Sequence, residues 1–476
     1  MRRFRPEWYV AAALLVLLVL TSARYGWHRD ELYFVVAGQH PAWGYPDQPS
    51  FTPLLAAALY RLGGGSLVVL RLAAALASAA TVVLTGTIAG LLGGTNRARL
   101  LASAIWAVGT VALVTGHLVS TATFDVMFTA GVIACLLKAL TGGRPGWLIA
   151  GGAVLGAGLF NKLVIGIVAV LVGAALLVAG PRRPLLSRAA LAGAALAVLG
   201  ALPYLLWQTA HGWPQSQVAA SIAGGGNRIG VVPLQLFLVS IFLAPVLGAG
   251  LVRLLRGDLK AFGYAYLALL LVVVVTGGKG YYAAGLMPMI VAASGVAADG
   301  WLTRGRRLRR TLVSAAIGVS LVLNAVNSLP IVPAPRLQAS GVNTLNHEAG
   351  EQVGWPEYLR AVRSALPPGD HPPAVVFTAT YAEASAVRLG HGLPPAYSGQ
   401  NGYALWPPPA SATGPVILTG FTPGDATSRH FTGCRTVGHV DNGYALDNDE
   451  QGAALQLCDG PIGGWPAVWP LLVHYD

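Results

Sequence analysis

The sequence predicts a polytopic α-helical membrane protein with a C-terminal α/β domain outside the membrane. Of its 476 residues, 54% are hydrophobic and only 11% are charged, and the mean hydropathy is +0.60. Apolar runs of about 20 residues, long enough to cross a bilayer as helices, recur up to residue 330. After Pro330 the pattern ends, and 12 of the 19 acidic residues follow. We therefore expect a membrane domain at 1–330 and a soluble domain at 331–476.

About eleven transmembrane helices are predicted. The first run follows a basic N-terminus and resembles a secretory signal, but no clear cleavage site follows it, so we expect a retained helix. Two neighbouring runs are short, and if they formed one bent helix every later span would invert. The runs lie at 9–23, 67–93, 100–117, 122–140, 146–160, 163–180, 189–207, 231–252, 261–276, 281–299 and 311–329.

Basic residues orient these spans. With a cytoplasmic N-terminus, the inner loops carry 18 of the Lys and Arg residues before position 330 and the outer side carries 7, which is the bias expected of membrane proteins. The net charge of +12 is thus assigned to orientation and to contacts with anionic membrane lipids, and it does not indicate a nucleic-acid partner. We expect a multi-pass protein of the cell membrane whose C-terminal domain lies outside.

Charged residues gather on the predicted outer face. The first span is followed by the tetrad His28-Arg29-Asp30-Glu31, which as a mere interfacial anchor would have no need of adjacent acids. Asp125 lies at the outer mouth of the fourth predicted span, where a carboxylate either stabilises the helix dipole or faces a wet cavity. The outer acids before residue 330 are Asp30, Glu31, Asp47 and Asp125.

Two lysines on the same face suit an anionic ligand. Lys279 lies in the glycine-rich turn 276–282, where backbone amides can approach a phosphate closely and the ammonium adds a point charge. Lys162 lies between two predicted helices with almost no loop. The alternative is that both lysines extend to the membrane interface beside the aromatic residues Tyr281 and Tyr282.

Two other outer segments have a distinct composition. Residues 51–60 are apolar but too short to cross the membrane, so we expect a helix that lies along the interface or packs over the membrane domain. Residues 208–230 are rich in Gly, Trp and Pro, and we expect a mobile loop that could cover a site.

These motifs together resemble a known family. Arg-Asp-Glu-Leu-Tyr-Phe (29–34), Tyr-Pro-Asp-Gln-Pro-Ser-Phe-Thr-Pro-Leu-Leu (45–55), the outer Asp125 and Gly-Lys-Gly-Tyr-Tyr (278–282) are similar to the family 39 glycosyltransferases. These are GT-C enzymes of the protein-mannosyltransferase and lipid A aminoarabinose-transferase type. The resemblance covers roughly residues 1–330. The chain departs from it in its smaller number of spans and in Gln48, where some relatives have a phosphate-binding lysine.

The resemblance implies a GT-C-like transferase that moves a hexose or pentose from a polyprenyl phosphate, with inversion, to an acceptor hydroxyl on the outer face. The acceptor would be a protein, a glycolipid or a cell-wall glycan. The rival interpretation is a transporter or lipid-sugar flippase, which would place charges throughout the helices and carry an internal repeat. Neither feature is evident in the sequence.

Site roles follow from this chemistry. We expect Asp30 to be the general base, because an attacking hydroxyl needs a carboxylate within hydrogen-bond reach. Asp125 would either orient the acceptor or raise the basicity of the site through the proximity of two like charges. A divalent cation on Glu31 and His28 is an open alternative, but adjacent residues seldom chelate one ion well, so no metal is expected. The candidate catalytic residues are Asp30, Glu31 and Asp125. The candidate phosphate-binding residues are Arg29, Lys279, Lys162 and Tyr281. Supporting roles are expected for His28, Asp47 and Gln48.

The soluble domain is predicted to be a small α/β fold. Strands are expected at 374–378, 415–419 and 454–457, with helices at 355–366 and 380–389. Cys434 and Cys458 either form a disulfide or remain two buried thiols, and Cys135 is expected to be a core residue. From its side of the membrane, we expect the domain to select the acceptor or to cover the active site.

Overall fold

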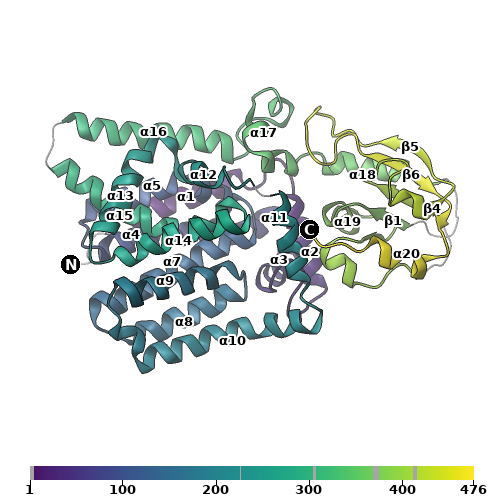
Figure 1. Ribbon diagram of the computed structural model, residues 1–476. Helices are drawn as coiled ribbons and strands as arrows, with labels where there is room; N and C mark the ends of the chain where they lie inside the picture. Colours follow the sequence, from purple (N-terminus) through teal and green to yellow (C-terminus); the bar gives the residue numbers. More distant parts are fainter. Residues whose placement is uncertain (1–4, 226, 304–306, 368–374, 411–414) are drawn as a thin grey trace.

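The computed structural model describes residues 5–225, 227–303, 307–367, 375–410 and 415–476. An elongated bundle of helices, formed by the chain up to Ser328, lies beside a smaller α/β domain (Figure 1). The last helix of the bundle ends at Ser328, and the domain boundary at residue 330 stays a prediction. Some of the basic residues counted above for the inner loops lie outside the described residues, namely Arg2, Arg3, Arg304 and Arg306. So do Gly226 of the segment 208–230 and Ala374 of the strand expected at 374–378.

Each predicted span coincides with helix. By length and composition, five described helices could cross a membrane, or seven if each of two bent pairs is one span. Four further predicted spans form shorter apolar helices, so the number eleven stays a prediction. The bundle helices are α1 (Glu7–Thr21), α2 (Arg29–Gln39), α3 (Phe51–Leu62), α4 (Leu67–Leu91), α5 (Asn96–Ala107), α6 (Thr110–His117), α7 (Thr121–Gly142), α8 (Gly146–Leu159), α9 (Val164–Ala179), α10 (Arg188–Ala210), α11 (Pro214–Gly225), α12 (Val231–Val239), α13 (Ala244–Arg256), α14 (Lys260–Thr276), α15 (Met287–Thr303) and α16 (Arg307–Ser328).

The two bent pairs break at neighbouring points. α5 and α6 meet at 61°, and α12 meets the segment Ile241–Arg256 at 89°. Each break frees a backbone carbonyl, and the side-chain amide of Asn324 on α16 donates to both, to Val108 O and to Val239 O at 2.7 Å each. One side chain therefore satisfies two backbone groups that an apolar interior would otherwise leave unpaired.

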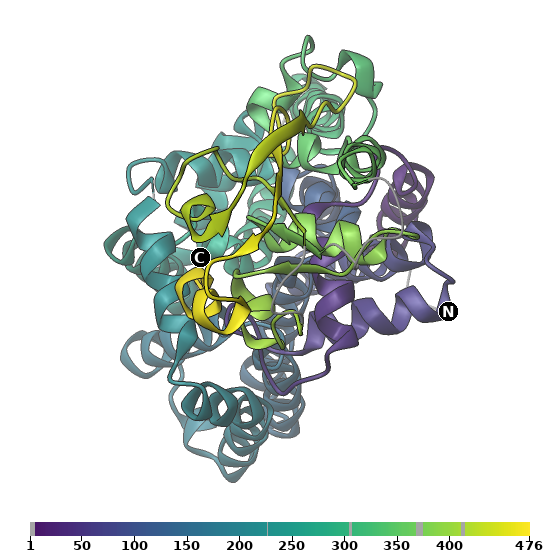
Figure 2. The same ribbon diagram turned by 90° about the vertical axis from the view of Figure 1, so that its right-hand side faces the viewer.

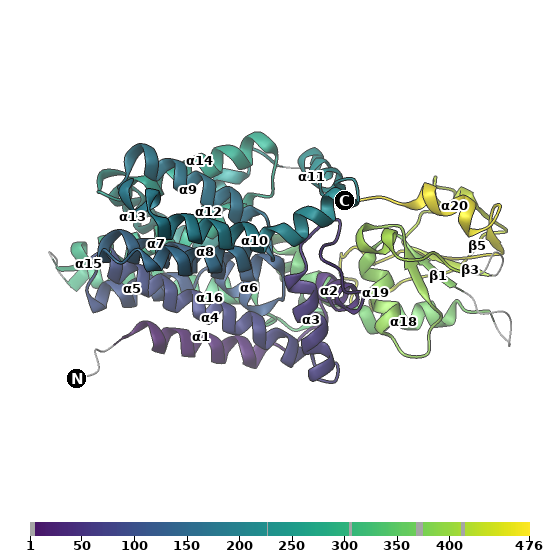
Figure 3. The same cartoon turned by 90° about the horizontal axis from the view of Figure 1, so that it is seen from below.

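Helices α2 and α3 form a layer at the end of the bundle that faces the α/β domain (Figure 3). α2 begins with a capping box, in which the His28 imidazole accepts from Asp30 N and the Glu31 carboxylate accepts from His28 N. α3 packs against α2, and the contact is close: a Cβ atom on Gly38 would lie 2.0 Å from Pro53 O. The predicted short helix over the membrane domain is thus confirmed.

The expected mobile loop at 208–230 is wrong for most of its length. Residues Pro214–Gly225 form α11, and Gln208 belongs to the last turn of α10. Proline at the first position of a helix has the right φ and lacks a donor that would be unpaired there, so Pro214 starts the helix rather than a loop. Figure 1 places α11 near the boundary with the α/β domain.

The C-terminal domain contains a five-stranded mixed sheet with strand order β2-β1-β3-β6-β5. β1 pairs in parallel with β2 and β3, and β6 pairs antiparallel with β3 and β5. The predicted elements are observed within two residues. They are α18 (Trp355–Ser364), β1 (Val375–Thr378), α19 (Tyr381–Leu389), β3 (Val416–Thr419) and β6 (Ala454–Cys458), with β2 (Ala396–Ser398) and β5 (Arg435–His439) completing the sheet.

The domain is docked on the bundle through α19, which packs against α2. Figure 2 views the molecule from the domain's side, with the sheet in front of the bundle. Cys434 and Cys458 form a disulfide, and Cys135 is free. Between bundle and sheet, the 3₁₀ turn η5 (His347–Gln352) runs along the same boundary and contributes side chains to it.

Candidate active site

A cavity of about 240 Å³ lies where the bundle meets the C-terminal domain. Its walls come from the first turn of α2, from α6 and α7, from the loop before α9, from the turn η3 (Gly280–Leu286) and from η5. Most of the lining is apolar. The polar and charged groups that line it include His28, Asp30, Asp125, Lys162, Tyr281, Tyr282 and Glu348.

Asp30 is held by a residue of the C-terminal domain. The Tyr381 hydroxyl donates to Asp30 Oδ1 at 2.8 Å. Asp30 is in the first turn of α2 and lines the cavity. Its carboxylate therefore faces the cavity with one oxygen already bonded.

Asp125 lines the same cavity from the first turns of α7. It is 5% exposed, and within the described residues its Oδ1 has no hydrogen-bond partner. Ser120 and Thr123 form a capping box that fixes the start of the helix just before it. A buried carboxylate oxygen with no protein partner is available to a ligand.

Lys162 also lines the cavity. Its ammonium lies 5.1 Å from the ring centre of Tyr281 and 4.9 Å from that of Tyr282. The preceding Asn161 anchors this tight loop, because its amide donates to Thr121 O at 2.8 Å and its carbonyl accepts from Thr52 at 2.6 Å. Lys162 is thus held beside Asp125 by contacts to α3 and α7.

His28 meets a carboxylate that the sequence did not single out. His28 Nε2 lies 2.7 Å from Glu348 Oε2. Burial alone would lower the pKa of His28, but the hydrogen bond to Glu348 and the nearby carboxylates of Asp30 and Glu31 raise it above its ordinary value. The hydrogen bond from His28 lowers the pKa of Glu348 to about 2. We infer a charged pair that joins η5 to the start of α2.

Glu31 differs from its expected catalytic role. It does not line the cavity, and its carboxylate accepts hydrogen bonds from Arg71 at 2.8 Å and from the backbone of His28 and Val119 at 3.0 Å each. Arg71 is itself 1% exposed and also donates to Gln352 of η5 at 3.2 Å. Glu31 and His28 each bind a different protein partner, so the arrangement does not fit the alternative of a cation shared by the two.

Arg29 also differs from expectation. Its guanidinium forms ion pairs with Glu351 and Asp449 of the C-terminal domain, and it does not line the cavity. His347, Glu351 and Asp449 have ligand atoms within 4.8 Å of one another, as a metal site would require. Arg29 is already paired with two of these three residues, Glu351 and Asp449. These ion pairs explain why the acidic side chains lie close together without a metal ion. The expected phosphate contact of Arg29 is not formed in this arrangement.

Lys279 lines a second cavity, of about 530 Å³, beside the first. This cavity lies between α11 and the glycine turn 277–280, and Tyr281 lines both cavities. Lys162 and Lys279 therefore line two different cavities that share Tyr281.

Asp47 and Gln48 lie outside the cavity lining. The Tyr33 hydroxyl donates to Asp47 Oδ1 at 3.0 Å and accepts from Gly402 N at 3.1 Å, so this turn joins α2 to the C-terminal domain. Burial raises the pKa of Asp47 to about 7. Gln48 is 4% exposed, and within the described residues its Nε2 has no partner. Their expected support of the site is therefore indirect.

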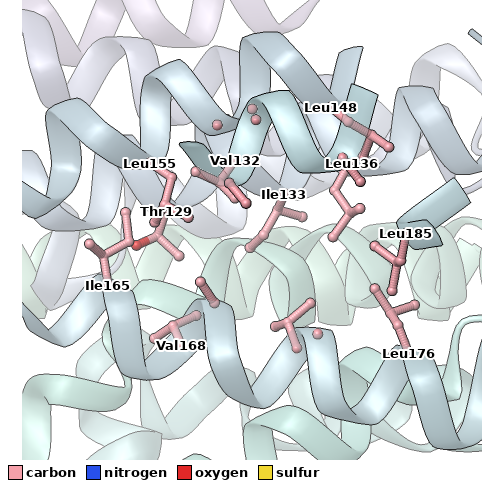
Figure 4. A pocket seen from close by; sticks show the side chains of 18 of the residues that line it. Thr129, Val132, Ile133, Leu136, Leu148, Leu155, Ile165, Val168, Leu176 and Leu185 are labelled. Carbon is pink, nitrogen blue, oxygen red and sulfur yellow. The ribbon is translucent and has the colours of Figure 1, made fainter. Parts of the chain in front are cut away.

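An apolar pocket of about 350 Å³ runs below the site, between α7, α8, α9 and the turn η1 (Arg183–Leu186). Figure 4 shows Thr129 and Ile165 at one end and Leu176 and Leu185 at the other. Thr129 follows Asp125 by one helical turn, and Ile165 follows Lys162 by three residues. The end of the pocket is therefore close to both charged groups of the cavity.

Comparisons with known proteins agree with this geometry. Residues 47–207 match the family model described as dolichyl-phosphate-mannose-protein mannosyltransferase. Crystal structures of ArnT from Cupriavidus metallidurans, bound to undecaprenyl phosphate and in the apo state, align with TM-scores of 0.61 and 0.62 at 14% and 15% identity. Both alignments cover 94% of this chain and 97% of that chain. The chain has the fold of a GT-C membrane glycosyltransferase. No curated protein sequence matches it.

The family resemblance drawn from the sequence motifs is thus confirmed at the level of the GT-C fold. Sequence reasoning missed four residues at the boundary between bundle and domain: Arg71, Glu348, Gln352 and Tyr381. A buried arginine inside an apolar run was the available signal for Arg71, since such a charge needs a partner. The other three are ordinary surface residue types, and only the docking of the C-terminal domain brings them to the site.

Proposed function

We propose that the protein is a membrane glycosyltransferase that moves a sugar from a polyprenyl-phosphate donor, with inversion, to an acceptor hydroxyl. The observation that carries the proposal is one cavity in a GT-C fold lined by the ammonium of Lys162 and by three carboxylates. Of these, Glu348 is paired with His28, which leaves Asp30 and Asp125 for the reactants. The acceptor hydroxyl must lose a proton as it attacks, and a carboxylate can take that proton. The phosphate gains negative charge as it leaves, and an ammonium can stabilise that charge.

Asp30 is the proposed general base. Its free oxygen accepts the acceptor's proton while the acceptor oxygen bonds to the anomeric carbon. Attack from the side opposite the leaving phosphate inverts that carbon. Asp125, whose Oδ1 has no partner within the described residues, would hold a second hydroxyl and so orient the acceptor or the sugar.

The donor phosphate is proposed to bind at Lys162, with Lys279 and Tyr281 beside it. The carbon–oxygen bond to the phosphate breaks with its electron pair on the phosphate, and a nearby ammonium stabilises the growing negative charge. In this structure Arg29 is bonded to Glu351 and Asp449, so its proposed role is to fix α2 against the C-terminal domain.

The apolar pocket of Figure 4 supports a lipid-linked donor. Its end lies close to Asp125 and Lys162, and Val132, Ile133, Leu136 and Val168 are among its lining residues. An isoprenoid chain could lie there with its phosphate at Lys162. The likeness to an ArnT structure bound to undecaprenyl phosphate favours the same class of carrier.

Two further parts of the proposal concern the side of the membrane on which the site lies and the class of acceptor. The site lies on the face that carries the C-terminal domain, and we propose that this face is the outer side of the cell membrane, with the N-terminus in the cytoplasm. The acceptor class stays open among protein, glycolipid and cell-wall glycan. The carboxylates of the cavity could bind a hydroxyl of any of these three acceptors, so they do not distinguish between them.

Asp30→Asn tests the proposal. The purified full-length protein would be placed in proteoliposomes with a panel of undecaprenyl-phosphate-linked hexoses and pentoses, and release of undecaprenyl phosphate would be measured. We expect turnover of at least one donor by the wild type and a loss of about 100-fold or more in Asp30→Asn. Asp258→Asn, an exposed change far from the cavity, is the matched control. Undiminished turnover by Asp30→Asn would remove the assigned base.

A further inference from the structure

Tyr381 is the first residue of α19, and it reaches from the C-terminal domain to the candidate base. Its hydroxyl lies 2.8 Å from Asp30 Oδ1, and the two residues are 351 positions apart in the sequence. α19 packs against α2, and Figures 1 and 3 both show the two helices side by side. The start of a helix in one domain thus meets the start of a helix in the other.

The Tyr381 ring is fixed independently of Asp30. Its centre lies 4.5 Å from that of Tyr33, and the guanidinium carbon of Arg29 lies 5.7 Å from it. The backbone N–H of Tyr381 donates to the side-chain carbonyl of Gln400 at 2.8 Å. Preceding it, Thr380 caps α19 in a capping box with Glu383. The hydroxyl is therefore presented by a rigid support rather than by a flexible side chain.

The hydroxyl occupies one oxygen of the carboxylate and leaves the other free. Among the residues that the structure describes, no other group donates a hydrogen bond to the Asp30 carboxylate. Burial and the negative charge of Asp30 raise the pKa of Tyr381 well above its usual value, so the phenol keeps its proton and acts as a donor. A carboxylate bonded at Oδ1 cannot rotate freely, and this fixes where Oδ2 points.

We propose that Tyr381 is a positioning residue for Asp30 and that the C-terminal domain thereby completes the active site. This inference rests on the proposed function. The acceptor's proton passes to Asp30 Oδ2, the acceptor oxygen bonds to the anomeric carbon, and the bond from that carbon to the phosphate oxygen breaks toward the phosphate. Tyr381 takes part in none of these bond changes. It holds the Asp30 carboxylate so that Oδ2 is aimed at the acceptor.

Tyr381→Phe is the direct test, because it removes only the hydroxyl and keeps the ring on Tyr33. In the proteoliposome assay, with the donor that the wild type uses, we expect kcat to fall about 10- to 100-fold and the donor KM to stay within about twofold. We also expect the acidic limb of the pH–rate profile to move to higher pH, because the ionised carboxylate loses its donor.

Tyr403→Phe is the matched control. Tyr403 is a buried tyrosine of the same domain whose hydroxyl bonds Ser385 at 2.9 Å rather than Asp30, so its removal should leave the acidic limb in place. An unmoved acidic limb in Tyr381→Phe would overturn the inference, whether kcat is unchanged or falls together with the unfolding temperature. A wild type that turns over no donor of the panel would overturn the proposed function and this inference with it.

Discussion

Glu31 on α2 and Arg71 on α4 form an ion pair at 2.8 Å in which both side chains are at most 1% exposed. The same guanidinium donates to Ser22 O at 2.8 Å and to Gly26 O at 2.7 Å. The pair therefore joins α2, α4 and the end of α1 at the point from which Asp30 enters the cavity. Asp30, the residue before Glu31, lines the cavity, while Glu31 holds the start of α2 in place.

Glu31→Gln should destabilise the protein. Removing one partner of a buried pair leaves the other charge uncompensated, which costs about 3–5 kcal/mol of the free energy of unfolding. We expect a lower thermal-unfolding midpoint in detergent. Glu357→Gln is the control, because its partner Arg360 is 69% exposed and such a surface pair contributes less than about 1 kcal/mol. Equal midpoints for the two variants would contradict a structural role for Glu31.

Asp125→Asn should separate activity from stability. The substitution keeps the shape of the side chain but removes a charge whose Oδ1 has no partner within the described chain. Because an unpaired buried charge is costly, we expect an unchanged or higher unfolding midpoint. Donor turnover should fall about 100-fold if Asp125 orients the reactants. Full turnover together with a lower unfolding midpoint would show that the carboxylate only stabilises the helix dipole.

Lys162→Met should weaken binding of the lipid phosphate. We expect the KM for the undecaprenyl-phosphate-linked donor to rise about tenfold or more, since one charge-assisted contact to phosphate is lost. Lys138→Met is the matched control, because Lys138 also lies over an aromatic ring, that of Trp147 at 3.8 Å, and lies outside both cavities. A similar KM in the two variants would argue against phosphate binding at Lys162.

The contact between His28 and Glu348 should depend on pH. The pKa of His28 is raised in the folded protein, so its contribution to stability is present below about pH 6.5 and is lost as the pH rises through the folded value. The pKa of Glu348 is lowered to about 2, so its contribution is present above about pH 4.5 and is lost as the pH falls toward 2.

The two windows overlap between about pH 4.5 and 6.5. The midpoint difference between the wild type and Glu348→Gln should be largest there and smaller at pH 8.5. The Glu348 side chain is 57% exposed, so solvent keeps the difference small. A difference that grows from pH 5 to pH 8.5 would show that the pair is not charged in this way.

Much of the fold could be predicted because it depends on local patterns. The apolar run 122–140 coincides with α7, and the buried run 415–419 coincides with β3. Bends within helices were harder to predict. The break at Val108 is stabilised by Asn324 from α16, a partner more than 200 residues away, and no local pattern reports such a contact. The loop expected at 208–230 failed for a different reason, because Pro214 begins α11 and the Gly, Trp and Pro content of the segment favoured a loop instead.

Candidate site residues could be predicted where an ionisable residue lies in an otherwise apolar stretch of the sequence. Asp30, Asp125 and Lys162 were found because an apolar stretch rarely carries an ionised group without a use. The roles within the tetrad were harder to separate, because consecutive residues of a helix point to different faces. Asp30 therefore lines the cavity while Arg29 and Glu31 meet other partners.

The Tyr381–Asp30 contact also bears on how the protein is made. Asp30 is synthesised 351 residues before Tyr381, and Glu348 and Gln352 follow the last helix of the bundle as well. A chain that is still being synthesised, or one that has lost its C-terminal domain, therefore has an Asp30 carboxylate without its Tyr381 partner. We expect such a chain to transfer lipid-linked sugar more slowly than the complete protein, because it lacks the contact that positions Asp30.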